Sequence, residues 1–260
     1  MPRFSANVST LFTELPFLDR FAAAREAGFE AVEFQFPYDF TPQEIAARVK
    51  DAGLMVVLFN LPPGDFAAGE RGLACHPRRE KEFAAGVSEA LRYAAMLDCR
   101  TINCLAGLLP IKTSEAEGRM ALKTNLSVAA SIMAKNGIQL VIEAINSFDM
   151  PRFFLNRSAD AEVLMDELQP LDVKFQYDVY HMQRMEGELF NTVRRLLPRI
   201  GHIQIADVPG RHEPGTGEIN FPNLFRHLDA IGYGGWVGCE YVPRTSTGKS
   251  LAWLRTWVGG

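Results

Sequence analysis

The stretch from residue 139 to residue 181 decides the fold: it reads QLVIEAI (139–145), then SADAEVLMDEL (158–168), then VKFQYDVYH (173–181). The first and last segments are apolar runs of strand length, whereas the middle segment has apolar residues at helical spacing. Strands with little alternation are typical of a parallel sheet that is covered on both faces. The stretch therefore predicts a strand, a helix, and a second strand parallel to the first.

The same alternation of strand and helix continues in both directions. The other expected strands are RFSANVS (3–9), AVEFQF (31–36), LMVVLFNLP (54–62), TINCLAG (101–107), IGHIQIAD (200–207) and GWVGCEY (235–241). Eight such units predict a single (β/α)8 barrel, one domain over residues 1–260. An open doubly wound sheet is the alternative, but it usually has a glycine-rich turn after its first strand, and NVSTLFTE (7–14) has no glycine.

The composition narrows the class of protein. Of 260 residues, 47% are hydrophobic and 22% are charged, as in ordinary globular proteins. The net charge is −4 with both signs mixed along the chain, so we expect no nucleic-acid partner. The four cysteines lack CxxC spacing and no signal peptide is recognisable, which predicts free thiols in a cytoplasmic protein. No apolar run has the length of a bilayer span, so no membrane partner is expected, whereas a homo-oligomer stays open.

Four polar residues stand inside apolar segments in the second half of the chain: Glu143, Asp178, Gln204 and Glu240. A carboxylate in a buried strand is unfavourable unless it is paired or bound to a cation. In a parallel barrel the C-terminal ends of the strands form one rim, so these side chains are expected to lie together. Three carboxylates and one amide oxygen suit Mg²⁺ or Mn²⁺ better than zinc. We therefore predict a divalent metal site made of these four residues.

Other residues are expected near this rim. His181 follows Asp178 by three positions and is placed to hydrogen-bond a substrate oxygen, and Arg211, in the loop after the seventh strand, is placed to clamp a substrate carboxylate. The long polar segment 62–79 is a candidate lid, with Glu70 and Arg71 in it.

Two further polar residues of the strands are expected to have structural roles. Glu33, within AVEF, is expected in a buried ion pair, and His202 is expected to be a hydrogen-bonded core histidine.

Glu143 and Glu240 can also act as bases. A metal chelated by a carbonyl oxygen and a neighbouring hydroxyl acidifies the carbon-bound proton between them. One glutamate can then remove this proton while the other returns a proton to the adjacent carbon. This chemistry is aldose–ketose isomerisation or epimerisation. No P-loop or glycine-rich dinucleotide turn is present, so no nucleotide cofactor is expected.

The chain resembles the hydroxypyruvate isomerase family, which includes 2-oxo-tetronate isomerases, within the xylose isomerase-like TIM barrels. The resemblance covers nearly the whole chain and is most specific in the loops AGERGLA (68–74) and PGRHEPGTGEINF (209–221), beside VIEAIN (141–146), QYDVYHMQ (176–183) and GWVGCEY (235–241). It implies that Glu143 and Glu240 are the proton donor and acceptor and that Asp178 and Gln204 complete the metal site. The implied substrate is a small keto acid, either hydroxypyruvate, which becomes 2-hydroxy-3-oxopropanoate (tartronate semialdehyde), or the four-carbon 2-oxo-tetronate.

Other functions stay open at this point. A ketose 3-epimerase or a sugar-acid lyase uses a similar barrel, and the wider superfamily usually has histidine where this chain has Gln204. A non-catalytic sugar-binding barrel leaves the paired glutamates unexplained. A DNA-repair endonuclease on the same barrel needs a three-zinc cluster rich in histidine and a basic face, whereas this chain has five histidines and an acidic balance.

Overall fold

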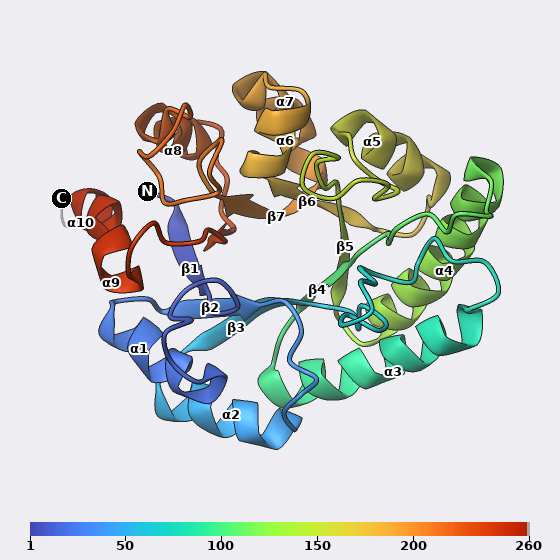
Figure 1. The fold of residues 1–260 in the computed structure, drawn as a ribbon, viewed down its shortest axis with the longest axis horizontal. Helices are drawn as coiled ribbons and strands as arrows, with labels where there is room; N and C mark the ends of the chain where they lie inside the picture. The colour runs from blue at the N-terminus through green and yellow to red at the C-terminus, as the bar shows by residue number, and fades with distance from the viewer. Residues whose placement is uncertain (259–260) are drawn as a thin grey trace.

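The computed structural model describes residues 1–258. Eight parallel strands close into a barrel in chain order, with β8 paired to β1. Figure 1 shows the strands at the centre and the helices in a ring around them. The predicted (β/α)8 barrel is therefore confirmed. The strands are β1 (Arg3–Asn7), β2 (Ala31–Phe34), β3 (Met55–Asn60), β4 (Thr101–Cys104), β5 (Gln139–Glu143), β6 (Lys174–Asp178), β7 (Ile200–Ile205) and β8 (Trp236–Cys239).

The start of the helix over Pro42–Asp51 is set by a capping residue. Thr41 caps the second α-helix: its hydroxyl accepts from the backbone N–H of Glu44, whose carboxylate accepts in return from the N–H of Thr41 at 2.8 Å. Within the described chain, none of the helices is both long and apolar enough to cross a membrane. They are η1 (Phe17–Asp19), α1 (Arg20–Glu26), α2 (Pro42–Asp51), α3 (Glu80–Leu97), α4 (Glu115–Lys135), α5 (Ser158–Glu167), α6 (Val179–Met185), α7 (Leu189–Leu196), η2 (Leu197–Arg199), α8 (Phe221–Ala230), α9 (Thr247–Ser250) and α10 (Ala252–Val258).

All eight strands are shorter than the apolar segments that predicted them, and one of them leads directly into a helix. The strand expected over 173–181 ends at Asp178, and α6 begins at the next residue. The cause is the side chain of Asp178, whose Oδ1 accepts from the backbone N–H groups of Tyr180 at 2.8 Å and His181 at 3.4 Å. Asp178 is thus the N-cap of α6, and His181 lies in the first turn of a helix rather than on a loop.

The apolar core fills the space between the strands and the surrounding helices, for example where Phe21 of α1 meets Phe34 of β2 edge-on. The inside of the barrel is polar at the level of the site. Glu33 of β2 contacts His202 of β7 at 2.8 Å, although β1 and β8 lie between those two strands. This contact therefore crosses the interior of the barrel, directly beneath the C-terminal rim.

Candidate active site

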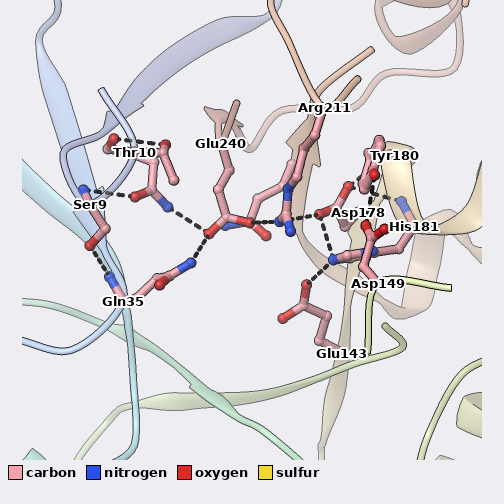
Figure 2. A network of polar contacts seen from close by, with 12 residues as sticks. Ser9, Thr10, Gln35, Glu143, Asp149, Asp178, Tyr180, His181, Arg211 and Glu240 are labelled. Atoms are coloured by element: carbon pink, nitrogen blue, oxygen red, sulfur yellow. Dashed lines mark hydrogen bonds and ion pairs between the residues drawn. The ribbon is translucent and has the colours of Figure 1, made fainter. Parts of the chain in front are cut away.

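Three buried carboxylates gather at the C-terminal rim, at the last residues of β5 and β6 and just after β8. Figure 2 shows Glu240 beside Arg211, then Asp178, then His181, then Glu143. Arg211 Nη2 lies 2.7 Å from Glu240 Oε2 and 3.7 Å from Asp178 Oδ2. His181 Nε2 lies 3.4 Å from Asp178 Oδ2 and 3.9 Å from Glu143 Oε1. The two glutamates thus stand at opposite ends of one row of charged and polar groups.

The electrostatics of this row differ from those of an ordinary ion pair. Burial raises the pKa of Glu143 well above its usual value, and the nearby negative charges of Glu240 and Asp178 raise it further. Burial also raises the pKa of Asp178 and of Glu240, although Arg211 opposes the shift in both. Carboxylates with raised pKa values in one cluster are typical of a site that binds a cation or transfers protons.

Glu33 is the internal comparison, because it is fully buried yet shifted the other way. Burial alone would raise its pKa, but the neighbouring His202 and the hydrogen bonds from His202, Gln204 and Ser5 outweigh burial and lower the pKa of Glu33. Glu33 thus has a buried partner, His202, at 2.8 Å, and the expected core role of His202 is confirmed. Glu33 is therefore compensated by the protein itself, whereas the three rim carboxylates are not fully compensated.

Burial of His181 lowers its pKa well below the usual value, and the positive charges of Arg211 and Arg184 add to this. The neutral form of the imidazole is therefore favoured in this site. One of its ring nitrogens and one carboxylate oxygen each from Glu143 and Asp178 lie within 4.8 Å of one another, close enough for these three residues to hold a metal ion. The sequence had placed His181 on the substrate instead, so the structure adds a candidate ligand.

Gln204 lies on β7 in register with Asp178 and Gly238. Its Nε2 donates to Glu33 Oε1 at 2.7 Å, and its Oε1 accepts from Gln176 Nε2 at 2.6 Å. The Glu33 carboxylate cannot donate, so the amide orientation is fixed. An amide oxygen has two lone pairs, so one remains for a cation, and the expected metal role of Gln204 stays a prediction.

Three amide side chains that we did not predict hold the glutamates in place. Asn7 Nδ2 and Gln35 Nε2 each donate to Glu240 Oε1 at 3.0 Å, and Asn103 Nδ2 donates to Glu143 Oε2 at 2.9 Å. Asn7 and Asn103 are polar residues late in apolar strands of the first half of the chain. The same signal that identified the carboxylates could therefore have found them.

The long segment between β3 and α3 packs against the chain that follows β4. Its backbone passes so close that a Cβ on Gly72 would lie 2.4 Å from the carbonyl oxygen of Leu105. Glu70 pairs with Arg79, and Arg71 donates to the carbonyl oxygen of Phe66 at 3.1 Å with its guanidinium 3.8 Å from the ring centroid of that residue. Glu70 and Arg71 thus stabilise their own segment, and a closing motion stays a prediction.

A parallel barrel with a cluster of buried carboxylates at its C-terminal rim defines the chain as a (β/α)8-barrel enzyme. The sequence model of the xylose isomerase-like TIM barrel family matches residues 21–257. A hydroxypyruvate isomerase of Escherichia coli is 50% identical over 254 residues, which cover 98% of each chain. A 2-oxo-tetronate isomerase of Cupriavidus necator is 47% identical over 259 residues, which cover 100% of each chain. The chain belongs to the xylose isomerase-like TIM barrel family, among its hydroxypyruvate and 2-oxo-tetronate isomerases, and is an isomerase.

Solved structures agree with this fold. The crystal structure of an AP endonuclease, family 2, from Brucella melitensis has a TM-score of 0.96 at 45% identity and covers 99% of each chain. A D-psicose 3-epimerase with D-fructose has a TM-score of 0.76 at 21% identity and covers 100% of each chain. At that lower identity the likeness concerns the fold alone.

Proposed function

We propose that the protein isomerises a small 2-oxo acid that has a hydroxyl on the carbon next to the keto group. The reaction converts hydroxypyruvate to 2-hydroxy-3-oxopropanoate, or acts in the same way on the four-carbon 2-oxo-tetronate. The observation that carries the proposal is the row of buried groups between Glu143 and Glu240, whose carboxyl pKa values are raised. The names of the relatives at 40–50% identity support the same reaction class.

Three carboxylates are buried together, and Arg211 contributes a positive charge beside two of them. These residues suit a hard divalent cation, because such cations bind carboxylate oxygens. Glu143, Asp178, Gln204 and Glu240 would hold Mg²⁺ or Mn²⁺. When bound, such a cation supplies positive charge that stabilises the negative charge developing on the substrate oxygens.

Hydrogen bonds from amide groups fix one oxygen of each glutamate and leave the other oxygen facing the row. Glu240 Oε1 accepts from two amides, whereas Oε2 faces the row and accepts from Arg211. Glu143 Oε2 accepts from Asn103, so Oε1 faces His181. The row-facing oxygen of one glutamate, which starts as a carboxylate, takes the proton from the hydroxyl-bearing carbon. The other glutamate, which starts protonated, gives a proton to the former keto carbon, while the hydroxyl proton moves to the former keto oxygen. Atoms and charge then balance, and we expect Arg211 to bind the substrate carboxylate.

A substrate panel tests the proposal: hydroxypyruvate, 2-oxo-tetronate and free ketoses, each with and without EDTA. We expect turnover of a keto acid, its loss with EDTA, and its recovery on adding Mg²⁺ or Mn²⁺. Turnover of free ketoses alone would instead support the epimerase alternative.

A variant tests the roles of the residues. Glu240→Gln should still bind the metal and lose isomerisation, whereas Glu44→Gln, on the exposed start of α2, should keep it. A Glu240→Gln enzyme with normal turnover would rule out the two-glutamate mechanism.

The likeness to the Brucella melitensis AP endonuclease structure does not lead us to propose DNA repair for this chain. A three-zinc cluster needs several histidines in one place. Among the described residues, His181 is in the carboxylate cluster, but His202 pairs with Glu33, and His212 and His227 contact the backbone carbonyl oxygens of Val242 and Phe190.

A further inference from the structure

The buried side-chain amide of Asn146 contacts His181, and its orientation bears on which ring nitrogen of His181 carries the proton. Asn146 follows β5 and is fully buried. Its Oδ1 accepts from the backbone N–H of Phe148 at 3.1 Å and from that of Asp149 at 2.9 Å. Backbone N–H groups only donate, so the oxygen of Asn146 must face them. The amide nitrogen therefore points to the other side, where it donates to Asp149 Oδ2 at 3.0 Å.

The same amide nitrogen lies 2.7 Å from His181 Nδ1. Since Asn146 Nδ2 donates there, Nδ1 must accept and cannot carry a proton. A flipped amide would place the oxygen against the Asp149 carboxylate and the NH₂ group against two backbone N–H groups. An imidazolium would place an N–H of His181 against the NH₂ group. Both alternatives bring like groups together in a buried place, and both are disfavoured.

We infer that Asn146 is a positioning residue that fixes His181 as the Nε2-protonated tautomer, so that His181 is a hydrogen-bond donor in the site and not a metal ligand. The Nε2–H points toward Asp178 Oδ2 at 3.4 Å and Glu143 Oε1 at 3.9 Å. Both distances are too long for strong hydrogen bonds, so this donor is available to an oxygen atom of the substrate. A cation held by Glu143 and Asp178 would not gain His181 as a ligand, because the imidazole lone pair is directed at Asn146.

The inference rests on the proposed function only where it assigns a substrate oxygen as the acceptor of the hydrogen bond from His181 Nε2. The tautomer itself is a property of the protein alone, so its test needs neither substrate nor metal. Failure of the substrate panel leaves the tautomer standing, and an Nδ1-protonated His181 leaves the isomerase function standing.

Side-chain ¹H–¹⁵N spectra of the ¹⁵N-labelled protein at neutral pH test the tautomer. The chain has five histidines, so a His181→Gln variant identifies the resonances of His181 by their disappearance. We expect an unprotonated Nδ1 and a protonated Nε2 in the unaltered protein. A protonated Nδ1 in this sample overturns the inference, and this outcome does not depend on any variant folding.

A charge-conserving exchange tests the cause. In Asn146→Asp combined with Asp149→Asn, a carboxylate oxygen replaces the amide nitrogen beside His181 Nδ1, while the number of charges stays the same. We expect His181 to become protonated at Nδ1. Asp149→Asn alone is the matched control and should leave Nδ1 unprotonated, because Asn146 is unchanged. If the exchanged variant also keeps Nδ1 unprotonated, Asn146 does not set the tautomer.

Discussion

Replacing Glu33 by glutamine tests whether the negative charge of Glu33 stabilises the hydrogen-bonded polar groups inside the barrel, beneath the site. The Glu33 carboxylate accepts four hydrogen bonds: Oε2 from Ser5 Oγ and His202 Nε2, both at 2.8 Å, and Oε1 from Asn7 and Gln204, at 3.2 and 2.7 Å. Glutamine has the same shape but donates at one of its two ends. Its NH₂ group can face Ser5 and His202, because a hydroxyl can turn and a neutral imidazole can accept. Its oxygen then keeps the bonds from Asn7 and Gln204.

The expected loss follows from this arrangement. A hydrogen bond to a charged group contributes about 1.5–3 kcal/mol and a neutral one about 0.5–1.5 kcal/mol, so weakening several of them together lowers the free energy of unfolding by about 3 kcal/mol. Removing one partner of a buried ion pair has a similar effect, about 3–5 kcal/mol. Chemical denaturation at neutral pH measures the loss. The control is Glu44→Gln on the surface, where glutamine can replace glutamate in the capping box, so little change is expected.

The dependence on pH has a definite sign. The folded-state pKa of Glu33 is lowered by its neighbours, so the stabilising contribution is complete above the ordinary glutamate pKa. It is lost as the pH falls from that value through the lower folded-state pKa. The difference in unfolding free energy between the native protein and Glu33→Gln should therefore shrink on acidification over this window. A difference below about 1 kcal/mol at neutral pH would refute the reasoning, since several charge-assisted bonds cannot contribute so little.

Three further predictions concern other parts of the same structure. A Cβ at position 238 would lie 2.3 Å from both carboxylate oxygens of Glu33. Gly238→Ala should therefore destabilise the protein by about 1–3 kcal/mol, measured by thermal melting. An unchanged melting temperature would contradict this close packing. Arg211→Gln should raise the KM for a keto acid roughly tenfold to hundredfold with a smaller change in kcat, and an unchanged KM would exclude the carboxylate clamp. The four cysteines are buried free thiols whose pKa values are raised by burial. A thiol reagent should therefore label them quickly in the unfolded protein and very slowly in the native protein. Fast labelling of the native protein would contradict the burial of these thiols.

The barrel could be predicted because its strands and helices differ in the period of their apolar residues, which is a local signal. The clustering of Glu143, Asp178 and Glu240 could be predicted because the C-terminal ends of parallel strands meet at one rim. The first turn of α6 could not, because DVYH continues an apolar run and only the cap formed by Asp178 ends the strand.

Which residues contact Glu240 was also beyond the sequence. Asn7 is 233 positions away along the chain, and closure of the barrel through β1 and β8 brings the two residues together. The polar position of Asn7 in an apolar strand could have singled it out, but it does not reveal which residue Asn7 contacts.

Asn7 contacts both the buried carboxylate of Glu33 and the carboxylate of Glu240 in the site. Its Oδ1 accepts from the backbone N–H of Ser9 at 3.0 Å, which orients the amide so that Nδ2 donates to Glu33 Oε1 and to Glu240 Oε1. Glu33→Gln in its favoured orientation keeps an acceptor for Asn7, so it should lose stability but keep most of its activity. Asn7→Asp should do more harm, because a third carboxylate would face Glu33 and Glu240 at the distances now bridged by N–H groups.

Comparison with Asn7→Ala separates charge repulsion from the loss of the two hydrogen bonds. Both variants remove the donors, but only aspartate adds a negative charge. Turnover and melting temperature should therefore fall further in Asn7→Asp than in Asn7→Ala at neutral pH. Equal losses would mean that Asn7 contributes its hydrogen bonds alone and does not keep the two carboxylates compatible.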